Sequence, residues 1–329
     1  MILNTLNRSA VGRKELSYQQ QMQSRRSLWR HPALSGSLAL LAAFSVGTGW
    51  YALYIGFVDD RAIQLVLALF YLLLTIWHFG LMIRTVHLSS LAVTREKRDT
   101  ERWEALLLTG VSGREIIFGK WWATLRSMWQ DYLFLACLRA AAAFSISGIG
   151  SGIVPFYSSY ISYRIMDTNA LNIALGVVLV LALTLVNLPL TAAAGVMAAM
   201  DSKRGSGVAR GMAARAAFTT LAALLPLIVW VFVGSNWLWR YGVIANSDYT
   251  EISRFISQFS AILLDNGMSF GGNVIVNAYW SQNHLAANVL LTLLALGAYA
   301  GLTWGLLRVS QWRAERTGAL KVTESASSR

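Results

Sequence analysis

Residues 94–120, TREKRDTERWEALLLTGVSGREIIFGK, place eleven charged side chains between two long apolar stretches of the chain. The chain as a whole is poor in charge: 13% of its 329 residues are charged and 55% are hydrophobic. Its mean hydropathy is +0.48. A soluble domain typically carries about 25% charged residues. The composition therefore predicts a polytopic membrane protein with a charged segment exposed to water.

Six apolar stretches are long enough to cross a bilayer as helices, which takes roughly 20 residues. They are Leu34–Val58, Ala62–Ile83, Trp122–Ile146, Leu171–Met200, Met212–Gly234 and Leu285–Leu307. We predict an all-α polytopic membrane protein with six transmembrane helices in residues 34–307. The first stretch starts late and is too long for a signal-peptide core, so we expect it to be retained.

The basic residues lie in alternate loops. Of the 28 Lys and Arg, 23 fall in four segments: before the first span, between spans two and three, between spans four and five, and in the tail at 308–329. The third of these segments runs into the fifth span and contains Lys203, Arg204, Arg210 and Arg215. By the positive-inside rule all four segments, and so both termini, face the cytoplasm. The net charge of +12 then reflects which loops face the cytoplasm, and we expect no nucleic-acid partner.

Residues 1–33 contain an apolar stripe at helical spacing, formed by Val11, Tyr18, Met22 and Trp29, with basic residues on either side. This pattern predicts an N-terminal interfacial helix on the inner face of the lipid bilayer. A frayed basic tail is the alternative.

The outer loop, residues 235–284, carries a second amphipathic pattern over Tyr249–Leu263, which predicts a helix at the outer interface or over the bundle mouth. The sequence DNGMSFGGN at 265–273 would end it, and Val274–Trp280 predicts a second short outer helix. We expect the polar tail after Trp312 to be disordered.

The charged segment ends in Gly-Lys, as a phosphate-binding loop does. That loop requires four residues between its two glycines and a Ser or Thr after the lysine. Here Gly113 and Gly119 are separated by five residues, and Trp121 follows the lysine. We therefore expect no nucleotide site on this chain.

The local pattern instead predicts helix, tight turn, helix. Thr94–Leu108 is rich in helix formers, and Gly110 can adopt the left-handed conformation that ends a helix. Ser112 and Glu115 have the spacing of a capping box at the start of a new helix, which continues into the third span. A soluble partner that bound the first helix could thus move the third span, which follows the turn. The alternative is a solvated loop that only sets topology.

These residues resemble the first cytoplasmic loop of ABC-2 type transporter permeases. The family pattern of a charged cluster, Glu, Leu-Leu, Thr-Pro and Glu-apolar-Gly-Lys corresponds to Arg95–Glu101, Glu104, Leu106-Leu107, Thr109-Gly110 and Glu115–Lys120. The RKEL motif at Arg13–Leu16 is similar to the family's N-terminal interfacial helix. The chain departs from the family in Glu101-Arg102, where Gly-Thr is usual, and in Gly110, where Pro is usual.

The resemblance implies a permease subunit of the bacterial inner membrane that is not itself an enzyme. A separate ABC ATP-binding subunit would carry ATP and Mg, and this chain would carry no cofactor. Export would run through a dimer with a second copy or a paralogue. The coupling helix between spans two and three, in residues 84–121, would dock on the ATP-binding subunit. The residues implied for this contact are Arg95, Glu96, Arg98, Glu101, Glu104, Thr109, Gly110, Ser112 and Glu115.

Three further residues are candidates for the transport pathway: Asp131, Arg139 and His78. Ionisable groups inside a membrane are costly and often functional, although each could equally be satisfied structurally. The four histidines show no metal-ligand spacing, so no metal is expected. One alternative function is an ion-coupled secondary transporter, which should show several intramembrane ionisable groups. Another is a polytopic membrane enzyme, which should cluster His, Asp or Glu at a membrane face.

Overall fold

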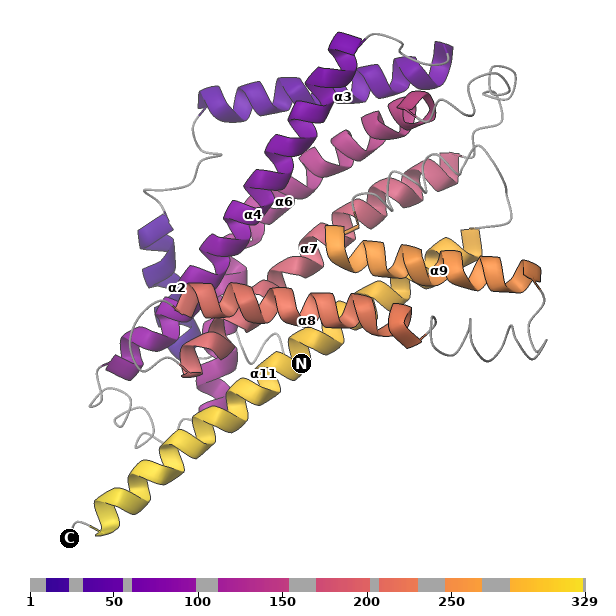
Figure 1. Ribbon diagram of the computed structural model, residues 1–329. Coiled ribbons are helices and arrows are strands. Elements are labelled where there is room, and N and C mark those ends of the chain that lie inside the picture. The colour runs from indigo at the N-terminus through magenta and orange to yellow at the C-terminus, as the bar shows by residue number, and fades with distance from the viewer. Residues whose placement is uncertain are drawn as a thin grey trace.

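The protein is all-helical in the part that the computed structural model describes, residues 10–23, 32–55, 61–98, 112–153, 170–201, 207–229, 246–267 and 285–327. Within these ranges only Ser112, Asn266 and Gly267 lie outside helices. The helices are α2 (Ala10–Gln23), α3 (Pro32–Ile55), α4 (Arg61–Arg98), α6 (Gly113–Ile153), α7 (Ala170–Asp201), α8 (Gly207–Val229), α9 (Asn246–Asp265) and α11 (Leu285–Ser327) (Figure 1). The predicted all-α fold is confirmed for these residues, whereas Val274–Trp280 lies outside them.

Four of the described helices are long and apolar enough to cross a membrane. Their candidate spans are Leu69–Arg95 in α4, Ala174–Met200 in α7, Gly207–Pro226 in α8 and Asn288–Arg316 in α11. They match the predicted spans two, four, five and six, and they indicate a multi-pass membrane protein. The first and third predicted spans are helical as α3 and α6 but are not among the four. In α6, charged residues between Lys120 and Arg139 lower the mean hydropathy.

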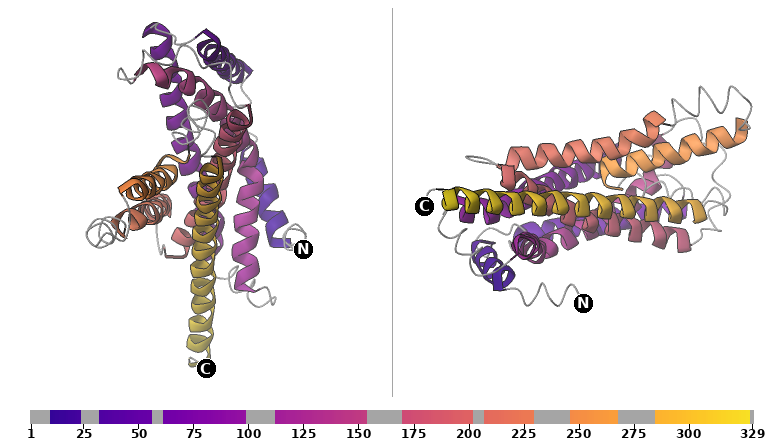
Figure 2. Two further views of the ribbon diagram at one scale, coloured as in Figure 1. Left: turned by 90° about the vertical axis from the view of Figure 1, so that its right-hand side faces the viewer. Right: turned by 90° about the horizontal axis from the view of Figure 1, so that it is seen from below.

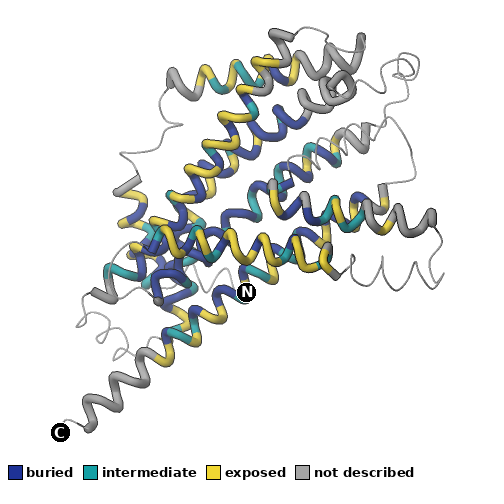
Figure 3. The backbone as a smooth tube through the Cα atoms, in the orientation of Figure 1, coloured by how far each residue is buried: buried dark blue, intermediate teal, exposed yellow. Residues whose placement is uncertain are grey.

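Helix α7 is the centre of the bundle. It contacts α4, α6, α8 and α11, and 61% of its span is buried, against 22–39% for the other three spans. In Figure 1, α4, α6, α7 and α11 run diagonally, α8 and α9 form a pair that crosses them, and α3 lies across the far end of α4 and α6. Large apolar side chains remain exposed, as Leu72, Leu225 and Leu293 illustrate. Figure 3 shows exposed positions alternating with buried ones along most helices. Such faces suit contact with lipid.

The end of α4, the start of α6, and the C-terminal part of α11 lie at the same end of the molecule (Figures 1 and 2). A Cβ added at Gly113, the first residue of α6, would lie 3.5 Å from Ala314 Cβ in α11. Helix α2 packs on α6 beside them. The described helix ends that border the first, second and fourth basic segments therefore lie at one end of the bundle.

Helices α4 and α11 extend well past their predicted ends. Helix α4 continues past Ile83, the predicted end of the second span, to Arg98. Thr85 Oγ1 donates to the carbonyl of Leu81 at 2.7 Å, and Thr94 Oγ1 to that of Ser90 at 2.9 Å. These bonds satisfy the hydroxyl groups within the helix itself.

The predicted disorder after Trp312 is wrong, since α11 continues to Ser327. Side chains one helical turn apart stabilise the extension. The Arg316 guanidinium lies 4.0 Å from the Trp312 ring centroid, and Gln311 Nε2 donates to Glu315 Oε1 at 2.8 Å. The prediction of disorder considered only the polar composition of the tail and not these pairs of side chains.

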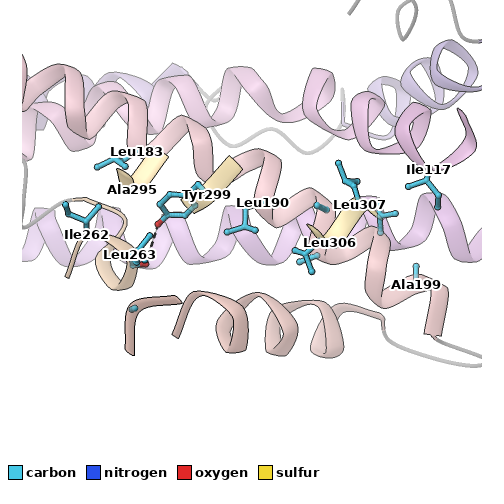
Figure 4. Packing of buried hydrophobic residues seen from close by; sticks show 14 of the residues in the cluster. Ile117, Leu183, Leu190, Ala199, Ile262, Leu263, Ala295, Tyr299, Leu306 and Leu307 are labelled. Carbon is cyan, nitrogen blue, oxygen red and sulfur yellow. Dashed lines mark hydrogen bonds between the residues drawn. The ribbon is translucent and has the colours of Figure 1, made fainter. Parts of the chain in front are cut away.

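The larger buried core joins α7, α9 and α11, and Leu183, Ile262 and Tyr299 lie near one another in it (Figure 4). Helix α9 confirms the predicted amphipathic helix over Tyr249–Leu263, whereas its predicted place on the outer side of the membrane stays a prediction. It is also tied to α8, because Ser260 Oγ donates to the carbonyl of Ala223 at 2.7 Å.

Close contact between α7 and α4 depends on Gly195, within the small-residue run TAAAGVMAAM at 191–200. A Cβ at this position would lie 1.9 Å from Ser89 Oγ and 2.8 Å from the Val86 carbonyl oxygen. Gly211 of α8 is similar, with Val86 Cγ1 at 2.5 Å. Small residues therefore let three helices meet around Val86.

We expect Gly195→Ala to lower the free energy of unfolding by about 1–3 kcal/mol, since the added methyl group overpacks this contact. Unfolding in mixed detergent and SDS micelles, followed by circular dichroism, measures the change. Gly297→Ala is the matched control, because its Cβ would meet nothing within 4 Å. An equal loss of stability in both variants would contradict the close α7–α4 contact.

Candidate functional site

The start of α6 is fixed by the predicted capping box. The backbone N–H of Ser112 donates to Glu115 Oε2 at 3.2 Å, and the N–H of Glu115 donates to Ser112 Oγ at 3.2 Å. The first helical backbone bond runs from Ile116 N–H to the Ser112 carbonyl at 3.2 Å. The capping box is confirmed, and it gives α6 a defined beginning directly after residues 99–111.

Lys120, at the end of the Gly-Lys pair, is fully buried and joins three helices. Its Nζ donates to the carbonyl of Ala92 in α4 at 2.5 Å and lies 3.6 Å from Glu15 Oε2 in α2. A buried ammonium group is tolerated only with such partners. The lysine that resembles part of a phosphate loop therefore serves an internal ion pair.

Glu15 is shared between two cations. Its Oε2 atom also lies 3.2 Å from Arg95 Nη2, and the Arg95 guanidinium stacks 3.8 Å over the Tyr18 ring. Glu15, Arg95 and Lys120 are called the Glu15 clamp below. Because these residues come from α2, α4 and α6, the clamp holds the three helices together at the charged end of the bundle.

Gln19 extends the contact between α2 and α6. Its Nε2 donates to Glu15 Oε1 at 3.2 Å and to Thr124 Oγ1 at 3.4 Å, while Ser127 Oγ donates to Gln19 Oε1 at 2.9 Å. Part of the predicted N-terminal helix thus exists as α2, and its buried face contains Glu15 and Gln19. Of the predicted apolar stripe, Val11 is half-buried, the structure describes only the backbone at Met22, and Trp29 lies outside the described residues. Tyr18 of that stripe is 40% exposed.

The residues implied for coupling fall into three groups. Arg95 is held by the clamp, and Ser112 and Glu115 form the capping box with their side chains exposed. Glu96 and Arg98 lie in the last turn of α4, where the structure describes only the backbone. The remaining residues lie outside the described part of the chain: Glu101, Glu104, Thr109 and Gly110.

The three pathway candidates are buried, and each has a contact with a different neighbouring residue. Asp131 Oδ2 pairs with Arg84 Nη1 of α4 at 3.3 Å. Arg139 Nη1 donates to Thr184 Oγ1 of α7 at 2.8 Å. His78 lies edge-on to Tyr132, with ring centroids 6.0 Å apart, and its Nε2 has no hydrogen-bond partner among the described residues.

A second polar centre, which the sequence analysis missed, surrounds Arg215 of α8. Arg215 is 7% exposed and donates from Nε to Thr191 Oγ1 at 3.0 Å, and from Nη2 to Asn187 Oδ1 and, at 3.2 Å, to Asn266 Oδ1. Tyr299 OH of α11 donates to the same Asn266 oxygen at 3.0 Å. These five residues, the Arg215 network, join α7, α8 and α11 to the end of α9.

The charge count led the sequence analysis to treat Arg215 as a marker of a cytoplasmic loop, whereas it is buried in α8. Within the described residues, no carboxylate pairs with it. The sequence did contain one sign of a buried polar centre. Asn187 and Thr191 are two polar residues one turn apart in the most apolar span.

The end of α9 positions Asn266 for this network. Asn266 has φ +57° and Gly267 has φ +78°, and the Gly267 N–H donates to the Ile262 carbonyl at 3.0 Å. This is the hydrogen bond of a Schellman C-cap. A Cβ at Gly267 would lie 2.2 Å from Leu183 Cδ1, so the turn also packs closely on α7.

Among the residues that the structure describes, no group of three or more His, Cys, Asp or Glu could hold a metal ion. Comparison of the chain with protein-family models, with curated proteins and with solved structures finds no match.

We expect Glu15→Leu to lower the free energy of unfolding by about 3–5 kcal/mol, because it leaves the buried Lys120 without its carboxylate. Adding Lys120→Met should restore a large part of this loss. Unfolding in mixed micelles measures both effects, with Gln20→Leu, at an exposed position of α2, as the control. A double variant no more stable than Glu15→Leu would show that the unpaired lysine is not the cause.

We expect Arg215→Met to release the end of α9, since Asn266 loses its cationic donor. Backbone hydrogen exchange in residues 246–267 should become about tenfold faster, the factor that corresponds to losing one hydrogen bond of about 1.4 kcal/mol. Arg210→Met, at an exposed arginine one turn earlier in α8, should leave this exchange unchanged. Equal exchange rates in the two variants would contradict the assigned network.

Proposed function

We propose that this chain is the membrane-spanning permease subunit of an ATP-driven transporter of the ABC-2 type. A separate ABC ATP-binding subunit supplies ATP and Mg, and a second permease copy or a paralogue completes the pathway. The complex exports its substrate across the bacterial inner membrane, with six spans per permease and both termini in the cytoplasm. The resemblance of residues 94–120 to the coupling loop of that family is the first support.

The observation that carries the proposal is how the charged segment is attached. Residues 99–111 are bracketed by the end of α4 and by the capped start of α6, and the Glu15 clamp ties these two helices together through Lys120. A force applied to the segment would reach both helices at once. Coupling to a soluble ATP-binding subunit requires such an attachment. A loop that only sets the membrane topology does not require it.

The Glu15 clamp also reduces the number of residues that we propose for contact with the ATP-binding subunit. Arg95 is engaged by Glu15 and Tyr18, so we assign it to the positioning of α4 rather than to the contact with the ATP-binding subunit. Ser112 and Glu115 are exposed but bonded to each other. The ATP-binding subunit would therefore contact mainly the segment that contains Glu101 and Glu104.

An ion-coupled transporter is the second candidate, and the buried Arg215 favours it. A guanidinium group keeps its proton at physiological pH, so Arg215 cannot carry protons itself. Asp131, the buried carboxylate in α6, is paired with Arg84. These two features leave this candidate weaker than the ATP-driven one.

We expect the tagged chain, purified from its native membrane, to retain an ATP-binding subunit that mass spectrometry identifies by its phosphate-binding loop. Arg98→Glu combined with Glu104→Lys should abolish this retention and the ATPase activity of the purified complex, because it reverses the charge pattern of the contact. Glu315→Lys, at an exposed acid at the same end of the molecule, is the control and should preserve both. Purification without any ATP-binding subunit, or full ATPase activity in the double variant, would refute the proposal.

A further inference from the structure

A pocket of about 170 Å³ lies between α2 and α4, next to the Glu15 clamp. This volume is far larger than a single water molecule requires. Leu88 and Leu91 of α4 line one part of it, and Glu15, Tyr18 and Arg95 line another. The pocket thus combines an apolar wall with a charged edge.

The pocket lies at the depth where lipid chains meet headgroups. The candidate span Leu69–Arg95 has 27 residues and is about 40 Å long, whereas the hydrocarbon core is about 30 Å thick. Even at a typical tilt of about 20° the span is longer than the hydrocarbon core, so its ends extend beyond it. We place Arg95, the last residue of the span, at headgroup depth, with Leu91 and Leu88 one turn and two turns deeper.

The charged edge has an excess of positive charge. Two cations, Arg95 and Lys120, share the single carboxylate of Glu15, so the clamp carries a net charge of +1. Lys120 is fully buried, but the Arg95 side chain is 36% exposed. A guanidinium group has five N–H donors, and Glu15 engages only Nη2 of Arg95. Arg95 can therefore bind a second anion from the pocket side.

We propose that this pocket binds one anionic phospholipid of the inner leaflet. Its phosphate lies on the Arg95 guanidinium, and the first methylene groups of one acyl chain lie along Leu88 and Leu91. Arg13 and Lys14, exposed on α2, add to the positive potential that attracts an anionic headgroup. The bound lipid bridges α2 and α4. This site goes beyond the transport function and does not depend on an ATP-binding partner.

The test uses native mass spectrometry of the purified full-length chain, delipidated in detergent and titrated with phosphatidylglycerol or phosphatidylcholine of the same chain length. The unmodified chain should bind one phosphatidylglycerol at least about fivefold more tightly than phosphatidylcholine. Inorganic phosphate at millimolar concentration should not displace it, because phosphate lacks the acyl chain. Displacement by phosphate would show that the site binds a simple anion rather than a lipid, and it would overturn the proposal.

Two variants and one control locate the site. Arg95→Gln should remove the preference for phosphatidylglycerol, and Leu91→Trp, which fills the pocket without touching the clamp, should weaken both lipids. Leu91 is 42% exposed, so this change should leave the fold intact. Arg126→Gln, at an exposed arginine of α6, should preserve the preference. Equal binding of the two lipids to the unmodified chain, or unchanged binding to Leu91→Trp, would refute the proposal.

Discussion

The fully buried ammonium group of Lys120 constrains the charged end of the bundle more than any other group in the described structure. Removing an ion from water costs several kcal/mol, and the cost is offset only when partners surround it. Its partners come from two other helices, Ala92 in α4 and Glu15 in α2. Separating α6 from either helix would leave a buried charge unpaired. The position of α2, a short and largely polar helix, follows from this constraint.

Polar groups and small residues specify the contacts between helices whose outer faces are apolar. Between helices in lipid the hydrophobic effect supplies little driving force, because lipid chains are as apolar as Leu. The Glu15 clamp and the Arg215 network each join helices from at least three parts of the chain through charged side chains. Gly195 lets α7 approach the backbone of α4 at Val86, and Gly211 lets α8 pack against the Val86 side chain. Together these contacts favour one arrangement of the helices over others that would bury the same apolar surface area.

The features that were predictable from sequence are those encoded within a few residues. The long apolar stretches, the Ser112–Glu115 capping box and the amphipathic α9 all depend on neighbours along one helix. The clamp and the Arg215 network were not predictable, because their partners are remote: Gln19 and Thr124, for example, are 105 residues apart. A charge count also treats every arginine alike, and it cannot separate a buried Arg215 from the loop residues before it. The coupling residues Glu101 and Glu104 stay a prediction, since they lie outside the described residues.

Helix α6 is tied to its neighbours at several depths. It meets α4 through Lys120 and, about 16 Å further along, through Asp131, and it meets α7 through Arg139 about 12 Å beyond that. Near the charged end, Trp121 Nε1 also donates to the Pro189 carbonyl of α7 at 3.0 Å. A helix held at so many levels cannot slide past its neighbours without breaking buried polar contacts. Under the proposed function, a load on residues 99–111 would therefore move α4, α6 and α7 as one body. The α8–α9 pair meets that body through the Arg215 network and the Gly211 contact, so its displacement against α7 would break the bonds of Arg215 and Asn266 to Asn187 and of Arg215 to Thr191.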